Sequence, residues 1–246
     1  MKVVINGACG RMGRTIISMM LPDERYEIVA AVDIHSEENG EYPVFKNIFD
    51  FDGDADCIID FSHHSAAADL CRYASGRNIP LVIATTAHTD EEKAVIGLAA
   101  KTIPVFYSAN MSLGIAVTAR LAKTAASLFP DADIEIIETH HNRKLDVPSG
   151  TAILLGNALR EVRPDAEFNI GRSENGKRPK NEIGIHSIRT GNTVGDHEII
   201  IATDTQSSRI RHEAHDRALF AEGALDAAEF ICGKPAGLYD MNSIVG

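Results

Sequence analysis

The stretch that decides the fold of the first half of the chain is KVVINGACGRMG, residues 2–13. A short apolar run is followed at once by Gly-x-x-Gly-x-x-Gly and then by a helical pattern. Glycines allow a tight turn and close approach of a pyrophosphate, and the start of a helix supplies N–H groups. We therefore predict a strand at Lys2–Asn6, a helix at 11–21 and a dinucleotide site between them. An ordinary tight strand-to-helix turn is the alternative interpretation.

Asp33 supports the dinucleotide interpretation. It lies 20 residues beyond Gly13, at the end of a second expected strand, Glu27–Val32, where an acidic residue reaches the ribose hydroxyls. No arginine follows Asp33, so a 2′-phosphate would meet a carboxylate without an obvious cationic partner, and the sequence favours NADH over NADPH. His35 or Lys46 could still assist NADPH.

Alternation of strands and helices continues to residue 107. Further strands are expected at 56–61, 81–84 and 103–107, with helices at 65–76 and 90–100. Short, continuous apolar strands of this kind are typical of a buried parallel sheet. The first half is therefore expected to be α/β, a doubly wound parallel sheet.

The second half has a different pattern. Helices are expected at Leu113–Leu128, 151–162 and 217–233, and strands at 134–139, 183–190, 196–203 and 207–213. Turn residues between the later strands favour a mixed, mostly antiparallel sheet with helices on one side, the α+β class. The last helix is expected to return to the first domain. We therefore predict a discontinuous domain, 1–108 and 217–246, around a second domain, 109–216.

Composition excludes several classes of protein. The chain has 246 residues and a net charge of -11, whereas a nucleic-acid partner needs a basic surface. No stretch reaches the roughly 18 apolar residues of a membrane-spanning helix. The four cysteines show no CxxC spacing, which indicates reduced thiols and a cytoplasmic protein.

The segment ETHHNRKLDVPSGT, residues 138–151, carries the strongest signal of chemistry. Two histidines, two basic side chains, two carboxylates and a hydroxyl-rich helix start lie within 14 residues. The N–H groups and hydroxyls around Ser149 suit a carboxylate, and Lys144 can balance its charge. A histidine is the side chain best matched to proton transfer near neutral pH.

Simpler interpretations of this segment stay open. Ser149 could be only a helix N-cap, and His140 and His141 could be surface residues at a strand end. A metal site is disfavoured, because adjacent residues of a strand point to opposite faces. The remaining histidine pairs, His63-His64 and His212-x-x-His215, have no obvious third ligand nearby in the sequence.

The whole chain resembles the dihydrodipicolinate reductase family. Residues 138–151 are similar to its signature E-x-H-H-x-x-K-x-D-x-P-S-G-T. The resemblance extends to the glycine loop, 60–62, 85–86, 109–114, 189–197, Arg217 and 237–241. It implies reduction of 4-hydroxy-tetrahydrodipicolinate to tetrahydrodipicolinate by NADH or NADPH, in lysine and diaminopimelate biosynthesis.

The resemblance also implies roles for particular residues. The cofactor pyrophosphate would contact Gly7, Gly10, Arg11, Met12 and Gly13, and Asp33 would bind the ribose. The nicotinamide would be lined by Phe61, Ser62, Ala84, Thr85, Thr86, Ser108, Ala109, Asn110 and Met111. His140 and Lys144 would be catalytic, with His140 as general acid. The small dicarboxylate substrate would be held by His141, Lys144, Ser149, Gly150, Thr151 and Arg217.

The family resemblance completes the fold prediction. It implies a Rossmann-like dinucleotide-binding domain and an α+β domain that binds substrate and forms a homotetramer through its sheet. Alanine stands at Ala84 and Ala87, where the family often has Gly-Thr-Thr-Gly. Because alanine disfavours positive φ, we expect the local backbone to differ there. Met111 replaces a frequent phenylalanine and can still pack on the nicotinamide ring.

Two other functions are compatible with the glycine loop. One is a different Rossmann amino-acid-type or homoserine-type dehydrogenase, which would not need the histidines and Lys144 joined to Ser149. The other is a nucleotide-sensing protein without catalysis, which could lose His140 and Lys144. The presence of both residues argues against it.

Overall fold

The computed structural model describes residues 1–35 and 40–246, which form two compact units. Unit 1 consists of Met1–Ser112, Ala218–Ile244 and Gly246, and unit 2 of Leu113–Arg217 and Val245. The polypeptide therefore builds most of unit 1, then unit 2, and then returns to complete unit 1. Within the described residues, no helix has the length and apolar character needed to cross a membrane.

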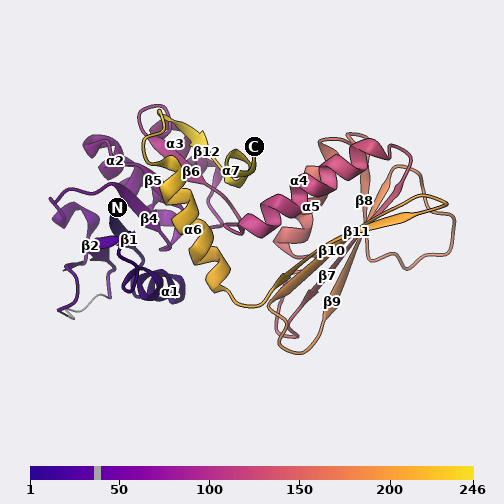
Figure 1. Cartoon of the computed structure of the whole chain (residues 1–246), viewed down its shortest axis with the longest axis horizontal. Helices are drawn as coiled ribbons and strands as arrows, with labels where there is room; N and C mark the ends of the chain where they lie inside the picture. Colours follow the sequence, from indigo (N-terminus) through magenta and orange to yellow (C-terminus); the bar gives the residue numbers. More distant parts are fainter. Residues whose placement is uncertain (36–39) are drawn as a thin grey trace. The chain divides into compact units, whose positions relative to one another are not determined.

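Unit 1 is built on a seven-stranded sheet in the order β12-β6-β5-β4-β1-β2-β3 (Figure 1). The strands are β1 Lys2–Asn6, β2 Glu27–Val32, β3 Val44–Phe45, β4 Cys57–Asp60, β5 Leu81–Ile83, β6 Pro104–Tyr107 and β12 Gly237–Tyr239. Every neighbouring pair is parallel. From β3 to β6 the order is that of a Rossmann fold, which confirms the predicted doubly wound sheet.

Helices cover both faces of this sheet. Helices α1 (Arg11–Met20) and α6 (Ala218–Ile231) contact each other and the sheet, and α2 (Ala67–Arg77) and α3 (Asp90–Ala99) form a second pair. Alternate strand residues face the α2 and α3 side, where they join one buried cluster. Between their end residues the strands are apolar because both faces are covered. A short α7 (Met241–Val245) ends the chain.

Unit 2 contains a five-stranded sheet in the order β11-β10-β7-β9-β8 (Figure 1). The strands are β7 Asp133–His140, β8 Glu167–Ile170, β9 Glu182–Arg189, β10 Gly195–Ala202 and β11 Ser207–Ala214. The sheet is mixed, as predicted, but only two of its four strand pairs are antiparallel, β10–β11 and β10–β7, whereas β7–β9 and β8–β9 are parallel. The antiparallel share is therefore smaller than expected, because α5 (Gly150–Arg160) lies in the crossover from β7 to β9.

One face of the second sheet is covered by helices. The buried isoleucines of β7, β9 and β10 pack against α5 and α4 (Leu113–Leu128). Along β7 the burial alternates, with Ile134, Ile136, Glu138 and His140 on the covered face. An inward glutamate and histidine in an apolar alternation are costly unless they are paired. This pairing defines the site described below.

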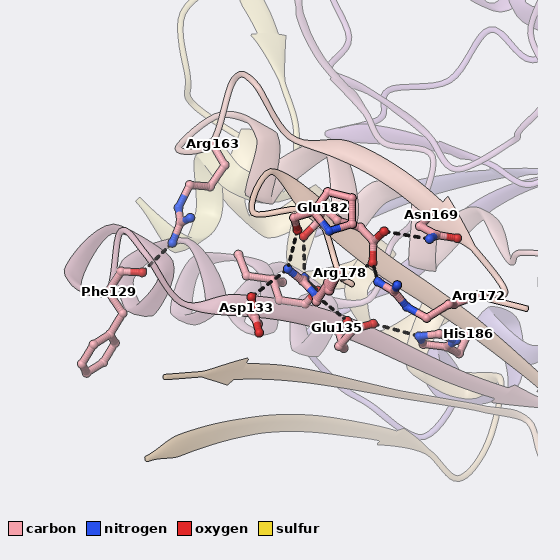
Figure 2. A network of polar contacts seen from close by, with 11 residues as sticks. Phe129, Asp133, Glu135, Arg163, Asn169, Arg172, Arg178, Glu182 and His186 are labelled. Atoms are coloured by element: carbon pink, nitrogen blue, oxygen red, sulfur yellow. Dashed lines mark hydrogen bonds and ion pairs between the residues drawn. The ribbon is translucent and has the colours of Figure 1, made fainter. Parts of the chain in front are cut away.

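The opposite face carries a network of ion pairs around Arg178, in the connection from β8 to β9 (Figure 2). Its guanidinium bonds Asp133 at 2.8 Å and Glu135 at 3.0 Å. The other oxygen of Glu135 lies 2.8 Å from His186 Nε2. Gly184 is opposite Glu135 in the register, and an added Cβ would lie 1.7 Å from that carboxylate oxygen. The glycine therefore leaves the room through which Glu135 reaches His186.

We expect Gly184→Ala to lower the free energy of unfolding by about 1–3 kcal/mol, because Glu135 must abandon bonds to charged partners. Urea denaturation measures this difference. The control is Gly97→Ala in α3, where an added Cβ meets nothing within 4 Å and should stabilise by about 0.5–1 kcal/mol. Equal or greater stability of the Gly184 variant would contradict the assignment.

Candidate active site

The glycine loop between β1 and α1 is closely packed on its inner side. Gly7 has φ +79°, and a Cβ there would lie 2.6 Å from the backbone of Phe61 and Ser62. A Cβ on Gly13 would lie 2.1 Å from the Gly7 carbonyl oxygen. Gly10 is the N-cap of α1 and makes no side-chain cap. The start of α1 thus offers backbone N–H groups without a competing side chain, which fits a pyrophosphate.

Asp33, at the end of β2, is fixed by backbone donors. The N–H groups of Cys9 and His35 donate to its two oxygens at 3.0 and 2.9 Å. Beside it lies a hollow of about 510 Å³, which Gly7 and Gly10 also line. Within residues 1–35 and 40–246, the aspartate and lysine side chains that line the hollow are Asp33, Asp69 and Lys46. This hollow extends from the glycine loop to the second strand, as an adenosine moiety requires.

Three further groups of predicted residues follow the carboxyl ends of neighbouring strands. They are Phe61 and Ser62 after β4, Ala84, Thr85 and Thr86 after β5, and Ser108, Ala109, Asn110 and Met111 after β6. The carboxyl edge of a parallel sheet is where ligands bind in this fold. The structure therefore brings these residues to one edge of unit 1, together with Gly7, Gly10, Arg11, Met12, Gly13 and Asp33.

Asp60 forms hydrogen bonds with several residues along this edge, although sequence reasoning gave it no role. It is 1% exposed. Its carboxylate accepts from Asn6 Nδ2 at 2.8 Å, from the Ser62 hydroxyl at 2.5 Å and from the Thr85 hydroxyl at 2.7 Å. One carboxylate thereby fixes a side chain at the end of β1 and side chains that follow β4 and β5.

The turn after β6 is fixed in a similar way. The Ser108 hydroxyl donates to the Asn110 carbonyl at 2.7 Å, and Asn110 Oδ1 accepts from the Ser112 N–H at 2.8 Å. Met111 is 3% exposed. A Cβ on Gly223 would lie 1.7 Å from the Met111 carbonyl oxygen, so α6 can approach this turn only because residue 223 is glycine.

In unit 2, Glu138 organises the end of β7. It is fully buried, and its Oε2 lies 2.5 Å from His140 Nδ1. Burial favours a raised pKa for Glu138, but hydrogen bonds from His140 and Arg189 outweigh it and hold the pKa well below its usual range. The ionised carboxylate only accepts, so Nδ1 carries a hydrogen and Nε2 is the nitrogen that can exchange a proton.

Arg189, at the end of β9, pairs with Glu138 in a two-pronged contact. Nη1 and Nη2 each donate to one oxygen of Glu138 at 2.8 Å. Nη2 also donates to the Asp146 carbonyl at 2.7 Å. Asp146 belongs to the segment that carries Lys144, and the Lys144 ammonium lies 2.9 Å from the Asp146 carboxylate. Arg189 therefore contacts both the strand end and this segment.

The start of α5 is fastened to the same carboxylate. Ser149 is the N-cap, its hydroxyl accepting from the Ala152 N–H at 3.2 Å, while its own N–H donates to Glu138 at 3.1 Å. The hydroxyl also lies 3.1 Å from His197 Nε2. Burial, with a smaller effect from His140, lowers the pKa of His197 to about 4. His197 is therefore neutral at pH 7.

Positive charge gathers where the predicted substrate residues lie. Burial and then the charges of Arg143, Arg217 and Lys144 lower the pKa of His141, which leaves this histidine neutral near pH 7. Gly150 and Thr151 form the first turn of α5. Unit 2 thus combines a histidine fixed by a carboxylate, a helix start and several cations, an arrangement suited to an anionic substrate that takes up a proton.

The structure keeps the predicted residues in two groups, one in each unit. Sequence reasoning gave no site role to Asp60, Glu138, Arg189 or His197. A signal for Glu138 was present, because it occupies an inward position in the alternation of β7, where a carboxylate needs a buried partner. Across residues 1–35 and 40–246, no cluster of three or more His, Cys, Asp or Glu is placed to hold a metal ion.

Ala87, in the loop after β5, has φ +66°, so this position has positive φ even though its residue is alanine. This conformation costs an alanine about 1–2 kcal/mol. We expect Ala87→Gly to raise the free energy of unfolding by about 0.5–1 kcal/mol, after the greater entropy of unfolded glycine is subtracted. Ala84→Gly, at negative φ, should instead destabilise in the same urea titration. If Ala87→Gly were no more stable than the wild type, the backbone at Ala87 would not be strained.

The lowered pKa of His197 predicts a pH-dependent stability. Between pH 6.5 and about 4 the unfolded histidine binds a proton that the folded one excludes, so stability falls as pH falls. From pH 7 to pH 5 the wild type should lose about 2 kcal/mol more than His197→Gln. Urea denaturation at both pH values measures this. Equal losses in the two proteins would show that His197 is not the group responsible.

Comparison with known proteins agrees with this geometry. The family descriptions "Dihydrodipicolinate reductase, N-terminus" and "Dihydrodipicolinate reductase, C-terminus" match residues 1–111 and 114–245. A curated 4-hydroxy-tetrahydrodipicolinate reductase of Clostridium novyi (strain NT) is 44% identical over 99% of this chain and 98% of its own. The corresponding protein of Caldanaerobacter subterraneus subsp. tengcongensis is 42% identical with the same coverage.

Solved structures give a consistent picture. A dipicolinate-bound dihydrodipicolinate reductase from Paenisporosarcina sp. TG-14 aligns with a TM-score of 0.84 and 26% identity over 97% of each chain. A DAP dehydrogenase from C. glutamicum has a TM-score of 0.60 at 14% identity, covering 98% of this chain and 93% of its own, and shares the fold alone. Since one family matches both halves and curated relatives exceed 40% identity along nearly the whole chain, this protein belongs to the dihydrodipicolinate reductase family.

Proposed function

We propose that the protein is an oxidoreductase that reduces 4-hydroxy-tetrahydrodipicolinate to tetrahydrodipicolinate with NADH or NADPH, in lysine and diaminopimelate biosynthesis. The observation that carries the proposal is the pairing of His140 with an ionised, buried Glu138, beside the capped start of α5 and several cations. Family membership and the names of the curated relatives support the substrate.

The substrate is a ring with two carboxylates, and we assign their binding to unit 2. Lys144 and Arg217 supply positive charge, and Gly150 and Thr151 supply N–H groups at a helix start. Ser149 shapes this start as its N-cap, with its own N–H bonded to Glu138. His141, neutral near pH 7, can donate a further hydrogen bond. The Lys144 ammonium lies 2.9 Å from the Asp146 carboxylate, so a substrate carboxylate would compete with Asp146 for it. Dipicolinate, the ligand of the Paenisporosarcina enzyme, is also a ring dicarboxylate.

His140 is the proposed general acid. Glu138 holds the Nδ1 hydrogen, which leaves Nε2 to deliver a proton as the substrate ring gains enamine character. A Cβ on Gly195 would lie 3.0 Å from Nε2, so the glycine at the start of β10 leaves space beside the reactive nitrogen. General acid assistance of this kind accelerates a reaction about 10²–10⁴-fold.

The residues of unit 1 fit the cofactor. Gly7, Gly10, Arg11, Met12 and Gly13 would hold the pyrophosphate, and Asp33 the ribose. When bound, the reduced nicotinamide supplies a hydride to ring carbon 4 of the imine formed by loss of water. The nicotinamide end would be oriented by Phe61, Ser62, Ala84, Thr85, Thr86, Ser108, Ala109, Asn110 and Met111. Among the described residues that line the adenosine hollow, two carboxylates against one ammonium support a preference for NADH.

Assembly and location are part of the same proposal. The face of the second sheet opposite α4 and α5 carries half-buried or exposed Ile137, Ile188 and Ile200. Uncovered isoleucines beside the charged network on this face support pairing between copies of the chain, and we propose a homotetramer formed through it. The four cysteines are free, which supports a cytoplasmic location.

The test is a coupled assay in which the upstream synthase condenses pyruvate with aspartate semialdehyde. We expect loss of reduced-nicotinamide absorbance that requires both proteins and is faster with NADH than with NADPH. His140→Gln should lower kcat about 10²–10⁴-fold with little change in NADH binding. Lys144→Ala should lower kcat and raise the substrate KM. Unchanged kinetics in both variants, or no oxidation by protein that binds NADH, would contradict the proposal.

A further inference from the structure

We infer that Glu138 and Arg189 are positioning residues, which hold the proton donor and the carboxylate-binding elements of unit 2 in one geometry. The inference rests on the proposed function. Unlike the catalytic and binding residues assigned above, these two residues need not touch the substrate.

Both oxygens of Glu138 accept hydrogen bonds from groups of the site. Oε2 accepts from His140 at 2.5 Å and from Arg189 Nη1 at 2.8 Å. Oε1 accepts from the Ser149 N–H at 3.1 Å and from Arg189 Nη2 at 2.8 Å. A carboxylate has about four acceptor positions; these four donors belong to the site, and the Ser187 hydroxyl of β9 is a further hydrogen-bonding partner of Glu138. A shift of Glu138 therefore moves His140 and the start of α5 together.

Arg189 extends the same constraint to a third part of the site. Its Nη2 also donates to the Asp146 carbonyl at 2.7 Å, which anchors the segment bearing Lys144. The general acid, the helix start and the lysine segment therefore meet at one ion pair. Their separation in sequence explains the need for it: Arg189 lies 51 residues after Glu138 and 43 after Asp146.

Stability is a poor explanation for a charge at this position. The inward residues that precede Glu138 on β7 are Ile134 and Ile136, both buried against α4 and α5. Well-packed apolar groups usually stabilise such a position as well as a buried ion pair does. What an apolar group cannot do is fix the tautomer of His140 or accept the Ser149 N–H.

The chain contains a matched control on the same strand. Glu135 also joins an arginine and a histidine, Arg178 at 3.0 Å and His186 at 2.8 Å (Figure 2). Residues 135 and 138 are an odd number of positions apart, so they point to opposite faces of the sheet. Glu135→Gln thus removes the same charge from the same kind of pair, away from His140.

The experiment is a double-mutant cycle in the coupled assay. Glu138→Gln should lower kcat about 100-fold in the wild-type background and less than about threefold in a His140→Gln background, because the carboxylate acts through that histidine. Assays at high enzyme concentration quantify the residual turnover. Glu135→Gln should change kcat less than about threefold. If the kcat losses of the two single variants multiply in the double variant, the inference is overturned. Equal kcat losses in Glu135→Gln and Glu138→Gln would also overturn it.

Two further measurements separate positioning from folding. Glu138→Asp keeps the charge but withdraws it from His140. It should lower kcat at least about tenfold while NADH binding to unit 1, measured by fluorescence, is unchanged. Without the carboxylate, the basic limb of the kcat profile of Glu138→Gln should move down by about one pH unit. An unmoved limb together with full activity of Glu138→Asp would overturn the inference. An inactive wild type would instead refute the proposed function itself.

Discussion

A carboxylate that is removed from water must find charge and hydrogen-bond donors inside the protein, and unit 2 is organised around that requirement at Glu138. The alternation of β7 turns this side chain toward the helices, where solvent cannot neutralise it. Its partners come from β9, from β7 itself and from the start of α5. The requirement draws together elements that are distant in the sequence, and the chemistry of the site uses the geometry that results.

Unit 1 contains a related arrangement with a different chemical outcome. Asp60 is also a buried carboxylate at the end of a strand, but the partners described for it are neutral, from Asn6, Ser62 and Thr85. It therefore orients side chains at the sheet edge without preparing a proton transfer. The Glu138 pair includes a cation and a titratable ring. In the proposed mechanism, two similar carboxylates thus serve the cofactor edge of one unit and the general acid of the other.

The elements predictable from sequence were those with strong local patterns. Leu113–Leu128 is a helix with the predicted bounds, and β1 and β2 likewise match. The sequence pattern did not predict strands β3, β8 and β12, which are short and lie at sheet edges. A strand with so few residues shows little hydrophobic periodicity. The parallel pairing of β7 with β9 was also missed, because strand direction depends on the crossover rather than on composition. His140 and Lys144 could be proposed from their segment. Arg189 could not receive a role, because its partner is set by the register of two distant strands.

The return of the chain to unit 1 has a consequence for how the protein is made. Helix α6 and strand β12 are synthesised only after all of 113–217. On the ribosome the first 112 residues therefore emerge without a helix that covers one face of their sheet and without the edge strand beside β6. The contiguous unit 2 can close its own core during that interval. Translation thus leaves the nucleotide-binding half incomplete until its end, and a truncated chain exposes the apolar face that α6 protects.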